Sequence, residues 1–169
     1  ALTLDRTLKS GIISSNETWA LSDSPFLITG DVGVASGATL TIEAGSIIKY
    51  AGDYKIQIKG SLNATGASEN RITFASNETD VSSGATMLIF EETNLSTSQM
   101  SYISMEDADV ALQLSDESEH DQAPTKNSGV LTITNLELDN ASIITDGYND
   151  DAELKINGAT IENSTIKGN

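Results

Sequence analysis

Short apolar segments recur at a fixed interval between residues 30 and 90, and this recurrence restricts what the chain can fold into. One series of apolar residues advances in steps of sixteen: Leu40, Ile56, Ile72 and Leu88. A second series keeps the same step two residues further on: Ile42, Ile58, Phe74 and Phe90. Each apolar pair encloses one residue that would point away from a core. Such self-similarity indicates a stacked, repeating architecture.

The repeated segments have the composition of β-strands. They are three to five residues long, rich in Ile, Thr, Val and Phe, and separated by turns that carry glycine, such as Gly37, Gly45 and Gly60. Stretches with apolar residues at helical spacing are hard to find, so crossover helices are not expected. The sequence therefore predicts an all-β fold.

A second register appears near the end of the chain, with a step of twenty-three residues. Four apolar residues and one asparagine recur in it, as the pairs Leu131 and Leu154, Ile133 and Ile156, Leu138 and Ile161, Ile143 and Ile166, Asn140 and Asn163. Asparagine tolerates the left-handed backbone conformation that tight corners need. We therefore expect Asn140 to stack on Asn163 at a corner between strands.

Three blocks carry a resemblance to a known group: residues 37–50, residues 56–66 and residues 72–76. They read GATLTIEAGSIIKY, IQIKGSLNATG and ITFAS, and together they resemble the opening coils of secreted bacterial right-handed parallel β-helix proteins, which have the pectate-lyase-like fold. The final LKINGATIENSTIKG is similar to the later coils of that group. The resemblance implies a right-handed parallel β-helix, or β-solenoid, and says almost nothing about activity.

The length of 169 residues suits one domain. We expect an N-terminal cap at residues 1–29, the first rungs at 30–114, a protruding acidic loop at 115–129 and C-terminal rungs at 130–169. Trp19 is expected to lie over the first rung as a lid, with a sugar-stacking platform as the rival interpretation. No cap is evident after residue 167, so the final rung is expected to be covered by further rungs or by a partner chain.

Charge excludes several classes of partner. The chain has 25 acidic residues against 9 Lys plus Arg, a formal net charge of −16, and no cysteine. Nucleic acids and anionic membranes would be repelled, because binding to phosphate needs a basic face. No apolar run approaches the ~18 residues of a membrane helix, so membrane insertion is not expected.

An enzyme must be weighed, because the β-helix group includes polysaccharide lyases and hydrolases. A lyase needs a base, for which the candidates are Lys49, Lys55, Lys59, Arg71 and Lys155. A hydrolase needs facing carboxylates, for which Glu91 with Glu92 and Asp107 with Asp109 are the candidate pairs. None of the bases sits in a recognisable carboxylate cluster, and acidic pairs arise freely in so acidic a chain. We therefore assign no catalytic residue, and the residues favour a non-catalytic role.

One segment has the composition of a calcium site. Asp146, Asn149, Asp150 and Asp151 fall close together, and Ca²⁺ prefers hard oxygen ligands of this kind. Their order matches no established calcium loop, and a solvated acidic turn is the favoured alternative.

Ice binding is a minor alternative, since β-helices can present flat rows of threonine. Thr39 with Thr41 and Thr132 with Thr134 form two Thr-x-Thr pairs. Steps of sixteen from Thr41 meet Gln57, Thr73 and Ile89, and a step of twenty-three from Thr132 meets Lys155, so no threonine ladder is expected to persist.

The favoured function is a non-catalytic module of a secreted or cell-surface bacterial protein. It would act as a rigid spacer, an adhesin or a surface that binds polysaccharide or cell-surface glycan, and the module would be extracellular. A polysaccharide lyase or hydrolase is the alternative.

Overall fold

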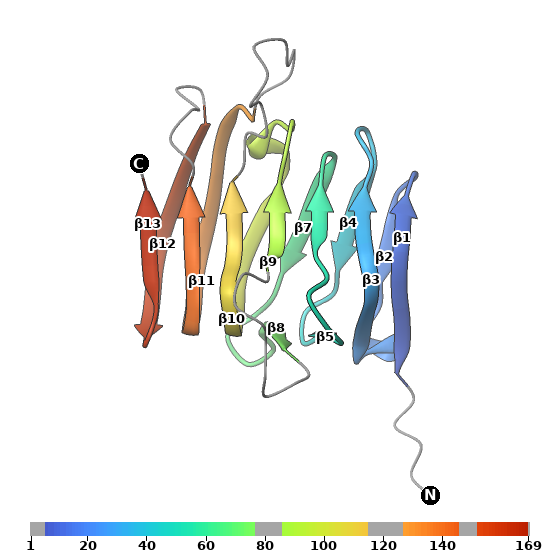
Figure 1. Ribbon diagram of the computed structural model, residues 1–169, viewed down its shortest axis with the longest axis horizontal. Coiled ribbons are helices and arrows are strands. Elements are labelled where there is room, and N and C mark those ends of the chain that lie inside the picture. Colours follow the sequence, from blue (N-terminus) through green and yellow to red (C-terminus); the bar gives the residue numbers. More distant parts are fainter. Residues whose placement is uncertain (1–5, 77–85, 115–126, 146–151, 169) are drawn as a thin grey trace, which may run out of the picture.

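The computed structural model describes residues 6–76, 86–114, 127–145 and 152–168. Within these ranges the chain forms thirteen strands and two 3₁₀ segments, η1 (Leu21–Asp23) and η2 (Leu95–Thr97), and no α-helix. The predicted all-β class is therefore confirmed. All pairings between these strands are parallel. The strands stack along one axis, with β1 (Thr7–Ile13) and β13 (Thr165–Gly168) at opposite ends (Figure 1).

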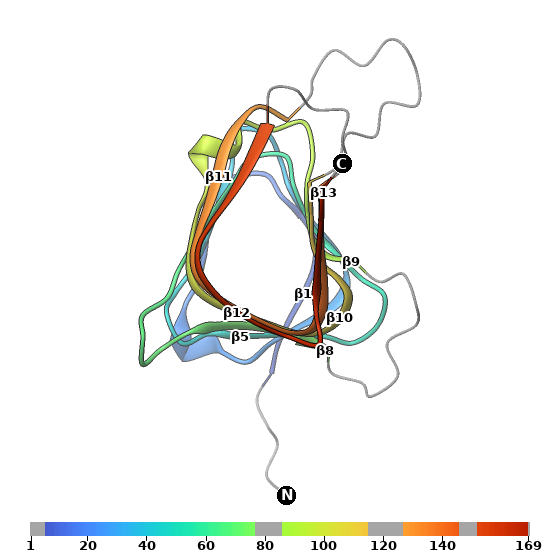
Figure 2. The same cartoon turned by 90° about the vertical axis from the view of Figure 1, so that its left-hand side faces the viewer.

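Seen along the stack, the strands outline a triangle (Figure 2). The first side consists of β2 (Glu17–Trp19), β4 (Thr39–Ile42), β7 (Ser61–Thr65) and the opening residues of β10 (Gln99–Leu114), β11 (Gly129–Thr145) and β12 (Ala152–Glu162). The second side consists of the opening residues of β1 and β3 (Phe26–Val34), then β5 (Ile47–Tyr50), β8 (Ile72–Ser76), the middle of β10 and β11, and the end of β12.

The third side consists of the closing residues of β1 and β3, then β6 (Ile56–Ile58), β9 (Thr86–Phe90), the closing residues of β10 and β11, and β13. The chain passes through the three sides in the same cyclic order in each turn. Because successive residues of a strand point to opposite faces, every second side chain enters the triangle and the others point outward.

The inward side chains form one continuous apolar core. Like residues stack on like: Leu40 pairs with Leu62, and Ile48 pairs with both Phe26 and Phe74. All of these side chains are buried. Tyr50 is buried among them, and its hydroxyl donates a hydrogen bond of 3.0 Å to the Met87 carbonyl. Burial raises the pKa of the Tyr50 phenol far above its ordinary value, so the residue stays neutral and keeps this bond.

Backbone of positive φ is concentrated at the corners. Asp107, Asn140 and Asn163 occupy equivalent positions in three successive turns, with φ of 54°, 48° and 48°. The predicted left-handed stack of Asn140 on Asn163 is therefore confirmed, and Asp107 extends it by one turn. The Asn140 amide donates a hydrogen bond of 3.0 Å to Asp107 Oδ1.

The two predicted registers had different outcomes. The step of twenty-three is confirmed, because Leu131 pairs with Leu154 and Ile143 with Ile166. The step of sixteen does not join neighbouring turns, since Leu40 pairs with Leu62 and Ile56 with Leu88. A step of sixteen leads from one side of the triangle to another, because a full turn of the chain is longer than sixteen residues.

The expected cap at residues 1–29 is itself part of the regular stack where it is described. β1 pairs in parallel with β3, and β2 pairs with β4. Trp19 lies at this end of the core, fully buried, with its ring 5.1 Å from that of Phe26. The sugar-stacking interpretation of Trp19 is therefore wrong, because no part of the ring is accessible.

Two predicted features lie partly or wholly outside the described residues. Of the expected loop at 115–129, only 127–129 are described, and they belong to the fold. Asn127 is fully buried, donating to the Phe90 carbonyl at 2.9 Å and accepting from the Thr93 amide at 3.1 Å. All four predicted calcium ligands, Asp146, Asn149, Asp150 and Asp151, lie outside the described residues.

Candidate binding face

From β2 to β11, the outward residues of the first side form a row of uncharged, mostly hydroxyl-bearing side chains, and in β12 the charged Glu153 and Lys155 border this row. The residues of the row alternate with buried residues such as Leu40, Leu62 and Ile133, which fixes their direction. We call this set the uncharged face: Thr18, Thr39, Thr41, Ser61, Asn63, Thr65, Gln99, Ser101, Val130, Thr132 and Thr134.

The register brings side chains together that the sequence keeps far apart. Thr18 pairs with Thr41, Thr41 pairs with Asn63, and Asn63 pairs with Gln99. Gln99 is followed in the next turn by Thr132, because Met100 pairs with Ile133. The two Thr-x-Thr pairs therefore lie on one side of the molecule. The observed register does not form a continuous threonine ladder, because Asn63 and Gln99 lie between the two pairs and Thr132 pairs with Lys155 in the next turn.

The second side has a different electrostatic character. Glu106 pairs with Asp139, and Asp139 pairs with Glu162, so three carboxylates stack on adjacent strands. Parallel strands lie about 4.8 Å apart, which is close enough for like charges to repel. The uncharged face has no such stack, so a neutral polar ligand would displace less water from charged groups there than on the second side.

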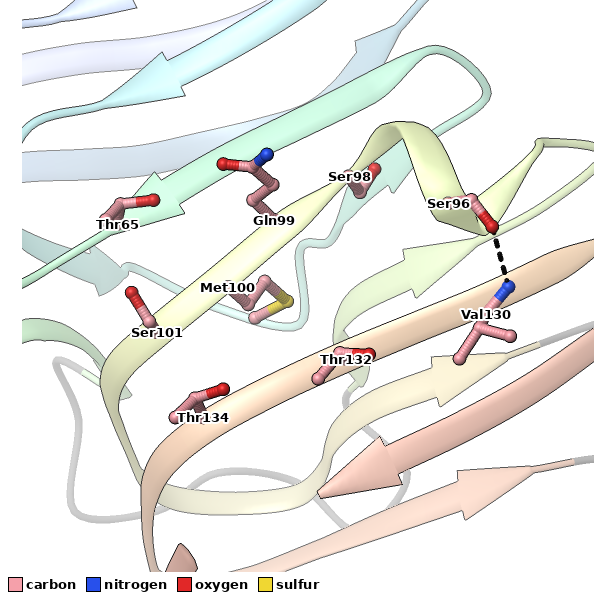
Figure 3. A pocket seen from close by; sticks show the side chains of 9 residues that line it. All are labelled: Thr65, Ser96, Ser98, Gln99, Met100, Ser101, Val130, Thr132 and Thr134. Atoms are coloured by element: carbon pink, nitrogen blue, oxygen red, sulfur yellow. Dashed lines mark hydrogen bonds between the residues drawn. The ribbon is translucent and has the colours of Figure 1, made fainter. Parts of the chain in front are cut away.

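A shallow groove of about 340 Å³ crosses the uncharged face between β10 and β11 (Figure 3). Thr65, Gln99 and Ser101 line one part of it, and Thr132 and Thr134 line the strand of the next turn. At one end, η2 brings Ser96 over β11, where its hydroxyl accepts a hydrogen bond of 3.0 Å from the Val130 amide.

Several polar groups in this groove have no partner among the described residues. The side chains of Gln99, Ser101, Thr132 and Thr134 make no hydrogen bond within that part of the chain. Thr65 donates to Asn63 Oδ1 at 3.0 Å, which leaves the Asn63 amide donors free for other partners. These groups can both donate and accept hydrogen bonds, the combination that a neutral polyhydroxyl ligand needs.

The lysine and arginine candidates for a base do not gather at one place. Lys59 forms an ion pair of 3.0 Å with Glu92, and Lys155 one of 3.2 Å with Glu153. Lys49 is an outward residue of β5 on the second side, and Lys55 directly precedes β6.

Arg71 has a structural role at a corner. It pairs with Glu137 at 2.9 Å, donates to the Asn135 carbonyl at 2.7 Å, and lies over the Tyr102 ring. Arg71 thus joins three successive turns of the stack.

The members of each predicted carboxylate pair make separate contacts. Glu91 is buried and accepts a hydrogen bond from Gln57, whereas Glu92 is exposed and pairs with Lys59. Asp107 accepts from Asn140, while the backbone carbonyl of Asp109 accepts from Ser142. Among the described residues, no three Asp, Glu or His side chains are placed to hold a metal ion.

The N-terminal end of the core carries a separate polar cluster. Glu17 Oε1 accepts hydrogen bonds from Lys9 at 2.7 Å and from the Trp19 indole at 2.8 Å. The hydrogen bond from Lys9 lowers the pKa of the Glu17 carboxyl more than its partial burial raises it. The Lys9 ammonium lies 5.1 Å from the centre of the Trp19 ring, so this cluster closes the end of the core with charged and polar groups.

Comparisons with known proteins add little to this description. No protein-family model and no solved structure matches the chain. A stretch of 69 residues, 41% of the chain, is 39% identical to the fruit-fly protein named bark beetle (Drosophila melanogaster), and it spans only 2% of that much longer protein. Within the described residues, no helix is long and apolar enough to cross a membrane.

Sequence reasoning missed the uncharged face as a unit. Its signal is present in the segments TLT, SLNAT, SQMS and LTIT, which contain no charged residue. Those segments can be recognised as neighbours only when the register of each turn is known.

Proposed function

We propose that this chain is a non-catalytic module of a secreted or cell-surface protein, built as a right-handed parallel β-helix, that binds neutral polysaccharide along the uncharged face. The parallel pairing of each side and the constant cyclic order of the sides support the β-helix assignment. The same elongated stack would also serve as a rigid spacer within an adhesin.

The observation that carries the proposal is the set of unpaired polar groups on an uncharged face. Gln99, Ser101, Thr132 and Thr134 offer donors and acceptors to sugar hydroxyls, and none of them carries a charge that would have to be desolvated. The nearest charges are Lys155 and Glu153 of β12, which pair with each other. The face lacks a free aromatic ring, so each sugar contributes little. Affinity is expected to depend on a long polymer that contacts several turns at once.

The test is retention on insoluble polysaccharides, with the chain length of the polymer recorded in the same samples. Cellulose, chitin and xylan serve as neutral probes, and pectate and alginate as anionic ones. We expect retention on a neutral polymer, weak retention on anionic ones, and no shortening. Shortened chains would instead support the lyase or hydrolase alternative. Retention on none of the neutral polymers would contradict binding and leave only the role of spacer.

A matched pair of variants locates the binding surface. Thr132→Glu places a charge in the groove and should weaken retention about tenfold, since a ligand would bury that carboxylate against unpaired hydroxyls. Thr73→Glu adds the same charge to an outward residue of β8 on the second side and should leave retention unchanged. Equal loss in both variants would contradict the assignment to the first side.

Ice binding is a second candidate, supported by the placement of both Thr-x-Thr pairs on one face. Asn63 and Gln99 interrupt the threonines between them, so the row is less regular than repeated Thr-x-Thr pairs would make it. Measurement of thermal hysteresis separates the two candidates, because a polysaccharide-binding face need not arrest the growth of ice crystals.

A further inference from the structure

The groove between β10 and β11 contains an apolar contact within its polar lining. Val130 is the single apolar member of the uncharged face, and it is only half-buried. Met100 also lines the groove, although its side chain is 2% exposed and belongs mostly to the core. Figure 3 shows Met100 between the two strands and Val130 beside Ser96. A ligand in this groove would therefore meet methyl groups as well as hydroxyls.

Gly129 allows η2 to close one end of the groove. Its φ of 76° lies in the left-handed region, and a Cβ atom there would lie 2.5 Å from Ser96 Oγ and 2.7 Å from Asn94 Oδ1. A larger residue would push η2 away from β11. Asn94 Oδ1 accepts a hydrogen bond of 3.1 Å from the Ser96 amide, which holds the segment that carries Ser96.

The Ser96 hydroxyl is placed to donate into the groove. Its oxygen accepts a hydrogen bond from the Val130 amide, and the hydroxyl donates to no other group among the described residues. A free donor thus lies directly beside the Val130 methyl groups. On the rest of the lining, the side chains of Gln99 and Thr132 are unpaired within that part of the chain.

An acetamido group matches this combination of groups. It carries a carbonyl oxygen, an N–H and a methyl group within a few bonds of one another. The carbonyl oxygen can accept from the Ser96 or Thr132 hydroxyl, and the N–H can donate to Gln99 Oε1. The methyl group can pack against Val130, which removes apolar surface of both partners from water.

Other substituents of a sugar ring would fit less well. None of the described residues that line the groove is charged. A carboxylate would lose water there without gaining a cation, and a free ammonium would lose water without gaining a carboxylate. A hydroxyl would satisfy the polar groups but leave Val130 in contact with water. Acetylation of an amino sugar removes its charge and supplies the methyl group.

We propose that the groove recognises the acetamido group of an N-acetylated amino sugar within a neutral polysaccharide. This inference rests on the proposed function and names the class of sugar. The volume of about 340 Å³ is at the lower end of the range for ligand pockets, so the groove would hold one substituted sugar. The other turns of the uncharged face would contact hydroxyl groups that acetylated and plain polymers share.

The test compares the affinity of the whole chain for chitin and for cellulose. The two polymers have the same backbone and differ in one substituent of each sugar, acetamido in chitin and hydroxyl in cellulose. Salt at about 0.5 M suppresses the attraction of this acidic chain to residual free amines. We expect a dissociation constant about tenfold lower for chitin, from the added methyl contact and hydrogen bonds. Soluble di-N-acetylchitobiose should compete for the chain, and cellobiose should not.

The outcomes separate this inference from the proposed function. Equal affinity for the two polymers would overturn recognition of the acetamido group and leave the proposed binding of polysaccharide in place. Retention on neither polymer would overturn both.

A matched pair of variants locates the contact. Val130→Thr exchanges one methyl group for a hydroxyl in nearly the same shape, and should weaken binding to chitin about fourfold while leaving cellulose unchanged. Thr41→Val makes the opposite exchange on β4, outside the groove, and should leave the ratio of the two affinities unchanged. Equal loss on both polymers in Val130→Thr would contradict the assignment. Circular dichroism of each variant verifies that it remains folded.

Discussion

At the scale of single residues, corner positions such as Asn140 depend on backbone that ordinary side chains adopt at a cost. Asn140 has φ of 48°, where glycine pays no steric penalty and most L-residues pay about 1–2 kcal/mol. Asn140→Ala should therefore lower the free energy of unfolding by about 1 kcal/mol more than Asn140→Gly. Both variants lose the hydrogen bond to Asp107, so their difference isolates the backbone conformation. Denaturation by urea measures the difference in free energy of unfolding between the two variants.

The control for this prediction is an asparagine on a strand. Asn157 is exposed in β12 and is not among the residues with positive φ. There the order should reverse, with glycine the less stable variant because it loses more conformational freedom on folding. The same order at both positions would show that corner strain does not govern Asn140.

Residue-scale features were the part of the fold that the sequence predicted best. Asparagine at a corner and isoleucine in a core act through local chemistry, so Asn140, Asn163 and Leu131 could be assigned without knowing the path of the chain. Trp19 was correctly expected at the end of the core. The sequence could not show that Phe26 and Lys9 would enclose the Trp19 ring, because those contacts require two strands to be placed first.

At the scale of elements, the stacked carboxylates of the second side are a local source of instability. Asp139 lies between Glu106 and Glu162 on adjacent strands. No ion pair involving Asp139 occurs among the described residues. Asp139→Lys should therefore raise the free energy of unfolding by about 0.5–1 kcal/mol, because it converts two repulsions into attractions. Thermal unfolding at low ionic strength measures the gain.

Two comparisons separate this electrostatic effect from other causes. Asp139→Asn removes the repulsion without adding attraction, and should give a smaller gain than lysine. At about 1 M salt, where charges are screened within about 3 Å, both gains should largely disappear. A gain that persists at high salt would show that packing of the new side chain, and not its charge, stabilises the strand.

The register of elements is where sequence reasoning failed, and the cause is the variable length of the turns. Thr41 lies 22 residues before its partner Asn63, whereas Asn63 lies 36 residues before Gln99. The extra residues of the longer turns lie in corner segments such as η2, and the lengths of these segments follow no period. Between the last two turns, every pair of stacked residues is twenty-three positions apart in the sequence. This was therefore the step between neighbouring turns that the sequence revealed. The uncharged face was missed for the same reason, because it exists only once the turns are aligned.

At the scale of the whole molecule, the net charge of −16 opposes compaction. Increasing NaCl from about 10 mM to about 300 mM shortens the Debye length from about 30 Å to well under 10 Å, and the temperature of unfolding should rise accordingly. Screening depends on ionic strength, so MgCl₂ and CaCl₂ at matched ionic strength should each reproduce most of the rise. Scanning calorimetry in the three salts provides the measurement.

The comparison among salts also tests the predicted calcium ligands. If residues 146–151 form only a solvated acidic turn, CaCl₂ and MgCl₂ should raise the temperature of unfolding equally, since both ions carry the same charge. A binding site would add a rise that depends on the concentration of Ca²⁺, because a ligand that binds the folded state stabilises it by mass action. Asp150→Asn would remove that additional rise and leave the screening effect in place. We expect the equal result, and an excess with CaCl₂ that disappears in Asp150→Asn would contradict it and establish the site.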